Sequence, residues 1–407
     1  MAPKDYIAAR QNQDQKDDPT NYHVILDDRP YYPFLTVDPN DHDSIRSAVA
    51  KLLENGASSS RWKVSVLAHV HEHKSWPVSV VSGGITNQLF RVEIPVIPNG
   101  NNTASVLVRI FGAEGMIDRD IENATYAALA SLDLAPSYYG RFANGRLEGW
   151  LDGMRPLTPR EMAQPKIASG IAKQLAAFHS KFRVPTDLQE YHNEASLSMW
   201  TQLYAWMDQA ANATFQNDND TERASKLKLE QIPKELKWLQ DDIIPKDAQV
   251  AFCHNDALAA NILYSPETNA IRLIDFEYGG MNYVAFDIAN HFNEYAGGTD
   301  TGITRYQWFP STEQQRAFLK IYLENATTTS TTTTTTTIAS NSPDLEAFHQ
   351  QVQAFILANH LYWGLWAVNQ AAVEGCQDFD YLLYASNRLA RYFDSKSKEY
   401  DSSSSSS

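Results

Sequence analysis

The spacing of apolar residues along the chain changes near its middle. Before residue 150, short runs containing valine, isoleucine and phenylalanine predict strands at 76–81, 87–92 and 106–111. Further on, apolar residues recur every three or four positions, which predicts helices. These helical segments are 167–179, 197–211, 227–239, 344–372 and 381–393. The pattern indicates the α+β class, with a β-rich first part and a mainly helical second part.

Local signals add three elements to the β-rich part. A helix is predicted after Ser44, a suitable N-cap, and it should end at Asn55 and Gly56. Its apolar positions recur at helical spacing: Ile45, Ala48, Val49, Leu52 and Leu53. A second helix should begin at the acidic segment 118–120, because acidic residues favour a first helical turn. An Asn-Gly pair at 144–145 predicts a hairpin of strands 138–142 and 146–151.

The second part contains short predicted strands between its helices, at 249–252, 262–264 and 271–274. We expect four regions in the chain. They are a polar N-terminal arm at 1–44, a β-rich domain at 45–150, a mainly helical domain at 151–396 and a disordered tail at 397–407. The threonine tract at 327–337 buries nothing and predicts an exposed insertion in the helical domain.

Composition and charge narrow the class of protein. The 407 residues are 43% hydrophobic and carry a formal net charge of −15, which argues against nucleic-acid binding because such proteins need a basic face. Two cysteines cannot make a disulfide framework, so a reducing compartment is expected. The first residues lack an apolar signal region, and no apolar run is long enough to span a bilayer. We therefore expect a cytoplasmic protein without membrane insertion.

The segments between the short strands of the second part carry the chemistry. His254, Asn255 and Asp256 follow one strand, Asn261 comes five residues after Asp256, and Asp275 follows a later strand. Phosphoryl transfer needs a carboxylate to orient the incoming hydroxyl and further oxygen ligands to hold Mg²⁺ against the phosphates. In that interpretation Asp256 is the base, while Asn261 and Asp275 hold metal. The alternative is a set of polar turns that cap strands.

The residues after the loop make the comparison more specific. The sequence around these residues resembles the choline/ethanolamine kinase family, and the resemblance extends from about residue 80 to 393. It is carried by His254-Asn255-Asp256, Asn261, Ile274-Asp275-Phe276-Glu277-Tyr278, Asn282-Tyr283, Phe286-Asp287-Ile288 and Asn290-His291-Phe292. The resemblance implies a protein-kinase-like, two-lobed fold and a kinase that uses ATP with Mg²⁺ on a small-molecule amino-alcohol. A homodimer stays open.

The resemblance also implies nucleotide-binding roles in the β-rich part. Ser82, Gly83, Gly84 and Asn87 match the loop that covers the nucleotide, where glycines let backbone N–H groups approach phosphate. Further expected cofactor-binding residues lie on the elements that follow. Arg109 would meet the phosphates with Glu122 as its ion-pair partner, and the segment from Glu148 to Trp150 would receive adenine mainly through backbone groups.

The substrate side follows from the same resemblance. Cationic amino-alcohols need carboxylates and aromatic faces. The expected residues on this side are Tyr278, Asp287, Glu294, Trp363 and Trp366, with Asp287 supporting the catalytic loop. Core packing is the alternative for either tryptophan, since the two share one helix face.

The segment around Glu294 resembles the ethanolamine branch, because choline kinases more usually have a cysteine before this glutamate and a tryptophan after it. Here the neighbours are Asn293 and Tyr295. We therefore expect an ethanolamine kinase that makes phosphoethanolamine, the family's first step towards phosphatidylethanolamine. A choline kinase or an aminoglycoside-type kinase is the alternative within enzymes, and a catalytically silent kinase-like binding protein is the alternative outside them.

Overall fold

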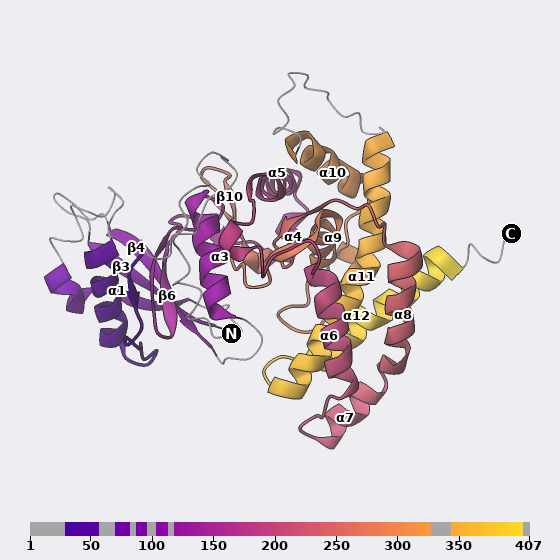
Figure 1. Cartoon of the computed structure of the whole chain (residues 1–407), viewed down its shortest axis with the longest axis horizontal. Helices are drawn as coiled ribbons and strands as arrows, with labels where there is room; N and C mark the ends of the chain where they lie inside the picture. Colours follow the sequence, from indigo (N-terminus) through magenta and orange to yellow (C-terminus); the bar gives the residue numbers. More distant parts are fainter. Residues whose placement is uncertain are drawn as a thin grey trace. The chain divides into compact units, whose positions relative to one another are not determined.

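The computed structural model describes residues 29–56, 70–81, 87–95, 103–112, 118–326 and 343–401. Clustering of contacts divides the chain into two compact units (Figure 1). The first unit comprises residues 1–154 and 183–191, and the second comprises 155–182 and 192–407. The threonine tract at 327–337 lies outside the described residues.

The first unit is built on a six-stranded sheet in the order β1-β5-β6-β4-β3-β2. Only the β1–β5 pair is parallel, and the other neighbours are antiparallel. The strands are β1 (Tyr31–Tyr32), β2 (Val78–Val81), β3 (Asn87–Pro95), β4 (Thr103–Phe111), β5 (Tyr138–Phe142) and β6 (Gly145–Gly149). The helical elements are α1 (His42–Gly56), α3 (Arg119–Ser131) and the short turns η3 (Val70–Ser75) and η4 (Thr186–Leu188).

Helix α1 packs its predicted apolar positions into the core of this unit. All five are buried together with alternate residues of β3 and β4, such as Val92, Val106 and Val108. The helix begins at His42 rather than after Ser44, because Asp41 accepts a hydrogen bond from the backbone of Asp43. The expected polar arm is therefore shorter than predicted. Residues 31–32 pair with β5, and Val37 is 1% exposed within the same core.

The predicted hairpin is present as β5 and β6, with Phe142 paired to Gly145 across a two-residue connection. The second strand begins at Gly145 and ends at Gly149, one residue earlier at its start and two at its end than expected. Gly145 is required by close approach: a Cβ here would lie 2.2 Å from the backbone oxygen of Arg109.

The second unit combines two small sheets with a group of helices. One sheet has the order β10-β9-β7, and the other is the antiparallel pair β11-β8. Their bounds are β7 (Arg155–Pro156), β8 (Val250–Cys253), β9 (Ile262–Tyr264), β10 (Ile271–Leu273) and β11 (Gly280–Tyr283). The long helix α11 lies beside α6, α9 and α12 (Figure 1).

Four of the five helices that the apolar spacing predicts for this unit are present close to their predicted bounds, while the one predicted at 227–239 is an α-helix only over Ile232–Trp238. The α-helices are α4 (Pro159–Met162), α5 (Pro165–Lys181), α6 (Ser198–Ala211), α7 (Asp218–Ser225), α8 (Ile232–Trp238), α9 (Val284–Glu294), α10 (Thr312–Ala326), α11 (Pro343–Glu374) and α12 (Tyr381–Lys396). Shorter turns are η5 (Leu229–Gln231), η6 (Leu239–Ile243), η7 (Ala259–Asn261), η8 (Tyr306–Trp308) and η10 (Ser397–Asp401). Within the described part of the chain, no helix has the length and apolarity needed to cross a membrane.

Two further parts of the second unit differ from the sequence prediction. The segment 397–401, expected in a disordered tail, forms η10, and the Tyr400 ring packs 5.3 Å from that of Trp238. Helix α9 was not predicted. Its residues are all buried, yet Asp287, Asn290, His291 and Glu294 recur three or four positions apart, so the helical spacing was present in the sequence and was overlooked.

We predict that Gly145→Ala lowers the free energy of unfolding by about 1–3 kcal/mol, because the added methyl group must displace backbone of β4. Urea unfolding of the purified protein measures this loss. Gly153→Ala is the matched control: it has positive φ but no atom within 4 Å of its Cβ position, so only a backbone cost of about 1 kcal/mol is expected. Equal losses in the two variants would contradict the close-approach explanation.

Candidate active site

The loop after β8 is shaped by the buried carboxylate of Asp287. This residue lies in the first turn of α9. Its Oδ2 accepts from the backbone N–H of His254 and its Oδ1 from that of Asn255, each at 2.8 Å. Two successive backbone N–H groups therefore turn towards one carboxylate, and this fixes the path of the chain into Asp256.

Asp287 has a third partner in His179 of α5, whose Nε2 lies 2.9 Å from Oδ2. A carboxylate only accepts, so Nε2 carries the hydrogen, and in that tautomer Nδ1 accepts from the Tyr322 hydroxyl at 2.9 Å. Burial raises the pKa of Asp287, but the interactions with its partners, the hydrogen bond of His179 first among them, outweigh burial, and the net pKa is lowered. The sequence did not indicate Tyr322, which is 143 residues from His179.

His254 orients the loop instead of acting on a substrate. Its Nε2 donates to the backbone oxygen of Ile274 at 2.9 Å, and its Nδ1 accepts from the backbone N–H of Asp256 at 3.3 Å. Burial lowers the pKa of its imidazole. Both ring nitrogens are thus used in hydrogen bonds within the protein.

Asp256 is held by Asn261 of η7. The Asn261 Nδ2 donates to Asp256 Oδ2 at 2.8 Å and to its backbone oxygen at 3.0 Å. In the described part of the chain no donor reaches the other carboxylate oxygen, Oδ1. Burial, followed by the charges of Glu294, Asp275 and Glu277, raises the pKa of Asp256 well above its usual value. A carboxylate with a raised pKa is a stronger base.

Asp275 is brought next to Asn261 by the pairing of β9 with β10. The backbone N–H of Ile274 donates to the backbone oxygen of Asn261 at 3.0 Å, and Asp275 is the next residue in the chain. It adopts a left-handed conformation, with φ of 63°. Because Asn261 directs its Nδ2 to Asp256, its Oδ1 remains an oxygen ligand. Amide and carboxylate oxygens are the hard donors that Mg²⁺ prefers, so the donor types of Asn261 and Asp275 fit the metal.

The aromatic residues expected on the substrate side lie together. The Trp366 indole N–H donates to the Tyr278 hydroxyl at 3.0 Å. The Trp363 ring stands edge-on to Tyr278 and to Trp366, with ring centroids 5.4 Å apart in both pairs. Tyr278 also belongs to the loop network, because its backbone oxygen accepts from Asn255 Nδ2 at 2.9 Å. One residue thus joins the aromatic group to the loop of Asp256.

Glu294, at the end of α9, has a partner that sequence reasoning missed. Its Oε1 accepts from Arg388 Nη1 of α12 at 3.0 Å, and both side chains are nearly inaccessible, at 3% and 1%. Burial raises the pKa of Glu294, while Arg388 opposes that rise. The 94 residues between the partners explain why local sequence patterns gave no signal for Arg388.

In the first unit, Arg109 lies within a buried network of four charged side chains. It stands directly opposite Arg146 across the β4–β6 ladder, an arrangement that repels unless anions intervene. Glu148 Oε1 accepts from Arg109 Nε at 2.8 Å and from Arg146 Nε at 2.7 Å. Tyr126 of α3 donates to Glu148 Oε2 at 3.1 Å. The two like charges are therefore bridged by one carboxylate.

The ion pairs recorded for Glu122 among the described residues are with other arginines, although the charge of Arg109 helps to lower the pKa of Glu122. Glu122 Oε1 accepts from Arg146 Nη1 at 2.8 Å, and its Oε2 accepts from Arg119 at 2.6 Å. Arg146 projects from the neighbouring strand and so occupies the place beside Glu122. Sequence reasoning missed Arg146, although its position two residues before Glu148 on one strand puts both side chains on the same face.

The remaining nucleotide-side residues are only partly described. Ser82, Gly83 and Gly84 lie outside the described residues, while Asn87 begins β3 and is buried. The Glu148 side chain is taken up by the two arginines. Trp150 is half-buried, and its ring lies 5.1 Å from the Arg91 guanidinium carbon.

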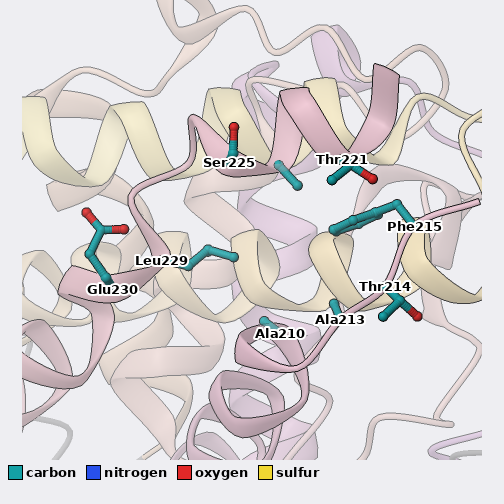
Figure 2. Close-up of a pocket in the computed structure, with 9 residues that line it drawn as sticks. Ala210, Ala213, Thr214, Phe215, Thr221, Ser225, Leu229 and Glu230 are labelled. Atoms are coloured by element: carbon teal, nitrogen blue, oxygen red, sulfur yellow. The ribbon is translucent and has the colours of Figure 1, made fainter. Parts of the chain in front are cut away.

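A cavity of about 390 Å³ lies elsewhere in the second unit, among α6, α7 and η5. Figure 2 shows the Phe215 ring between the helices, with Leu229, Ala210 and Ala213 along the wall and Glu230 at one end. None of the candidate catalytic residues lines it. We therefore base the candidate site on the geometry around Asp256 rather than on this cavity.

We predict that Glu148→Gln weakens the dependence of stability on acid pH. Burial raises the pKa of Glu148, but Arg109 and Arg146 bring it down to about 2. A depressed pKa contributes stability that is present above about 4.5 and is lost as pH falls towards about 2, on the order of 3 kcal/mol in total. Urea unfolding at pH 7 and at pH 3 measures how much the free energy of unfolding falls between the two. This fall should be about 2 kcal/mol smaller in the variant than in the wild type.

The control for this prediction is Glu346→Gln, which removes a carboxylate from an exposed pair with Arg316. Its pH dependence should follow the wild type. An unchanged slope in Glu148→Gln would contradict the role of the buried network.

Comparison with known proteins agrees with this geometry. Residues 78–393 match the family model described as choline/ethanolamine kinase. A "Probable ethanolamine kinase" of Arabidopsis thaliana is 33% identical over 77% of this chain and 78% of its own length. A "Probable choline kinase 3" of the same plant is 31% identical over 81% and 89%, respectively.

A solved choline kinase from Cryptosporidium parvum has a similar fold, with a TM-score of 0.70 and 24% identity over 89% of this chain and 97% of that one. The two-lobed, protein-kinase-like fold predicted from the sequence is thereby confirmed. The β-rich first unit and the mainly helical second unit described above, together with the match over residues 78–393, lead to one conclusion: the chain belongs to the choline/ethanolamine kinase family of phosphotransferases with an alcohol acceptor.

Proposed function

We propose that this kinase transfers the γ-phosphoryl group of ATP to the hydroxyl of ethanolamine, which forms phosphoethanolamine. The observation that carries the proposal is the arrangement of Asp256, Asn261 and Asp275 in one unit with an aromatic group and a buried carboxylate. Two carboxylates and an amide oxygen are the groups that phosphoryl transfer needs for a base and for metal binding. The aromatic and acidic groups suit a cationic acceptor.

Asp256 acts as the base in this proposal. Asn261 holds its Oδ2, so Oδ1 is the atom that receives the proton of the acceptor hydroxyl. The raised pKa supports this role, since the carboxylate has greater affinity for a proton than an exposed aspartate has. Asp287 and His254 act indirectly, because their hydrogen bonds fix the backbone on either side of Asp256.

Asn261 and Asp275 would hold Mg²⁺, which neutralises charge on the phosphates when bound. In the first unit, Arg109 would meet the phosphates, while Glu122 and Arg146 keep its surroundings fixed. Asn87 and the segment of Ser82, Gly83 and Gly84 would cover the nucleotide. Glu148 and Trp150 would receive adenine through backbone groups, since the Glu148 carboxylate is already engaged by two arginines.

The ammonium group of the acceptor would lie against Glu294 and the rings of Tyr278, Trp363 and Trp366. A primary ammonium has three N–H donors and needs acceptors, whereas a quaternary head has none and gains mainly from aromatic faces. The carboxylate of Glu294 favours the primary head, as does the likeness of the segment around Asn293 and Tyr295 to the ethanolamine branch. Ethanolamine and choline kinases are similarly related to this chain, so choline is the second candidate.

We predict that purified protein with MgATP converts ethanolamine to phosphoethanolamine with kcat/KM at least about tenfold above that for choline, a difference of roughly 1.4 kcal/mol. Coupled ADP release with a panel of ethanolamine, choline and an aminoglycoside measures the preference. Higher kcat/KM for choline would reverse the acceptor assignment. Nucleotide binding without turnover on any acceptor would favour a silent binding protein.

A second expected outcome concerns the base. Asp256→Asn should keep the fold, because the new side chain has nearly the same shape, but should lower kcat by at least about a hundredfold. The same assay measures it at saturating MgATP. Asp242→Asn, an exposed aspartate of the second unit, serves as the control and should retain turnover. Wild-type kcat in Asp256→Asn would exclude this residue as the base.

A further inference from the structure

The ion pair between Glu294 and Arg388 is the starting point, because stability does not account for it. Both side chains are at most 3% exposed, and a buried pair gains little over apolar residues of the same volume once desolvation is counted. Some polar atoms also stay unsatisfied. Arg388 Nε is buried with no hydrogen-bond partner in the described part of the chain. A buried ion pair that adds little stability and leaves a polar atom unsatisfied is a candidate for a functional role.

Arg388 holds only one oxygen of the glutamate. Its Nη1 donates to Glu294 Oε1 at 3.0 Å and to the Tyr384 hydroxyl at 3.1 Å. Its Nη2 donates to Oδ1 and to the backbone oxygen of Asn359, at 2.5 and 3.2 Å. Glu294 Oε2 receives no hydrogen bond from any residue that the structure describes. The planar guanidinium thus fixes the carboxylate and leaves one oxygen for a ligand.

The same arginine is connected to the aromatic group through two asparagines. Asn359 Nδ2 donates to Asn290 Oδ1 at 2.8 Å, and the Trp363 indole N–H donates to the same oxygen at 2.6 Å. A continuous chain of buried hydrogen bonds therefore joins Glu294 to Trp363 by way of Arg388, Asn359 and Asn290. It holds the acidic and the aromatic parts of the proposed acceptor site in one fixed arrangement.

Building on the proposed function, we propose that Arg388 is a positioning residue for recognition of the acceptor's ammonium group. It holds Glu294 by Oε1 so that Oε2 accepts an ammonium N–H, and through Asn359 and Asn290 it sets the position of Trp363 against that group. Arg388 does not touch the acceptor or the phosphates. Its loss should therefore weaken acceptor binding without a matching loss in the chemical step.

A double-mutant cycle on the acceptor KM tests this role. Glu294→Gln and Arg388→Met should each raise the KM for ethanolamine about tenfold or more, since each removes a charge-assisted contact. The double variant should be no more than about twofold worse than the worse single variant, because Arg388 acts through Glu294. The kcat and the KM for ATP should stay within about threefold of wild type in the single variants of Arg388.

The matched control is Arg316→Met, the same substitution at an exposed ion pair, which should leave both KM values unchanged. Arg388→Lys replaces Arg388→Met in the cycle if the latter does not fold. It keeps the charge but loses the fork, so its KM should lie between those of wild type and Glu294→Gln.

The proposal would be overturned if the two single increases in KM multiplied, to near a hundredfold in the double variant. An unchanged KM in both Arg388 variants would overturn it as well. Wild-type turnover reports separately on the proposed function. A wild type that uses choline instead of ethanolamine contradicts the acceptor assignment, and the cycle is then measured with choline. A wild type inactive on both acceptors overturns the function and the inference together.

Discussion

The carboxylate of Asp287 is the group on which the geometry of the second unit depends. It is wholly buried and accepts from two consecutive backbone N–H groups and one imidazole. Hydrogen bonds to a charged acceptor each contribute roughly 1.5–3 kcal/mol, and loss of the acceptor would leave the same N–H groups buried and unpaired. The loop conformation is consequently fixed by a residue 31 positions beyond Asp256, together with the hydrogen bonds of the loop side chains His254 and Asn255.

Most buried charged groups in the described parts of the two units have a partner of opposite charge. Arg109, Arg146, Glu122 and Glu148 form a network in which each group has an opposite charge, and Glu294 has Arg388. Asp256 differs, because the partner recorded for its carboxylate is a neutral amide. Unpaired negative charge in a low dielectric holds a proton more strongly. Asp256 is thus the carboxylate of the candidate site whose pKa burial and neighbouring negative charges raise most clearly above its usual value.

The sequence predicted the parts of this structure that depend on local pattern. The apolar spacing of α1 and the Asn-Gly pair between β5 and β6 gave these elements to within three residues of their ends. Helix α9 was not predicted, although Asp287, Asn290, His291 and Glu294 recur at helical spacing within it. The carboxylates and the amide of the loop could be chosen by chemistry and spacing. Their partners Tyr322 and Arg388 could not, because contacts across about a hundred residues are set by packing and leave no local periodicity.

Two residues of the candidate site, Asn255 and Asp275, adopt left-handed backbone conformations, with φ of 65° and 63°. Asparagine, aspartate and glycine tolerate this region far better than other side chains, and β-branched residues least of all. In a saturation mutagenesis survey, most substitutions at these positions would therefore lower activity because they disfavour the backbone conformation, whatever the chemistry of the new side chain. Glycine and asparagine at position 275 are the replacements that separate the two causes, since both keep the turn while removing the charge.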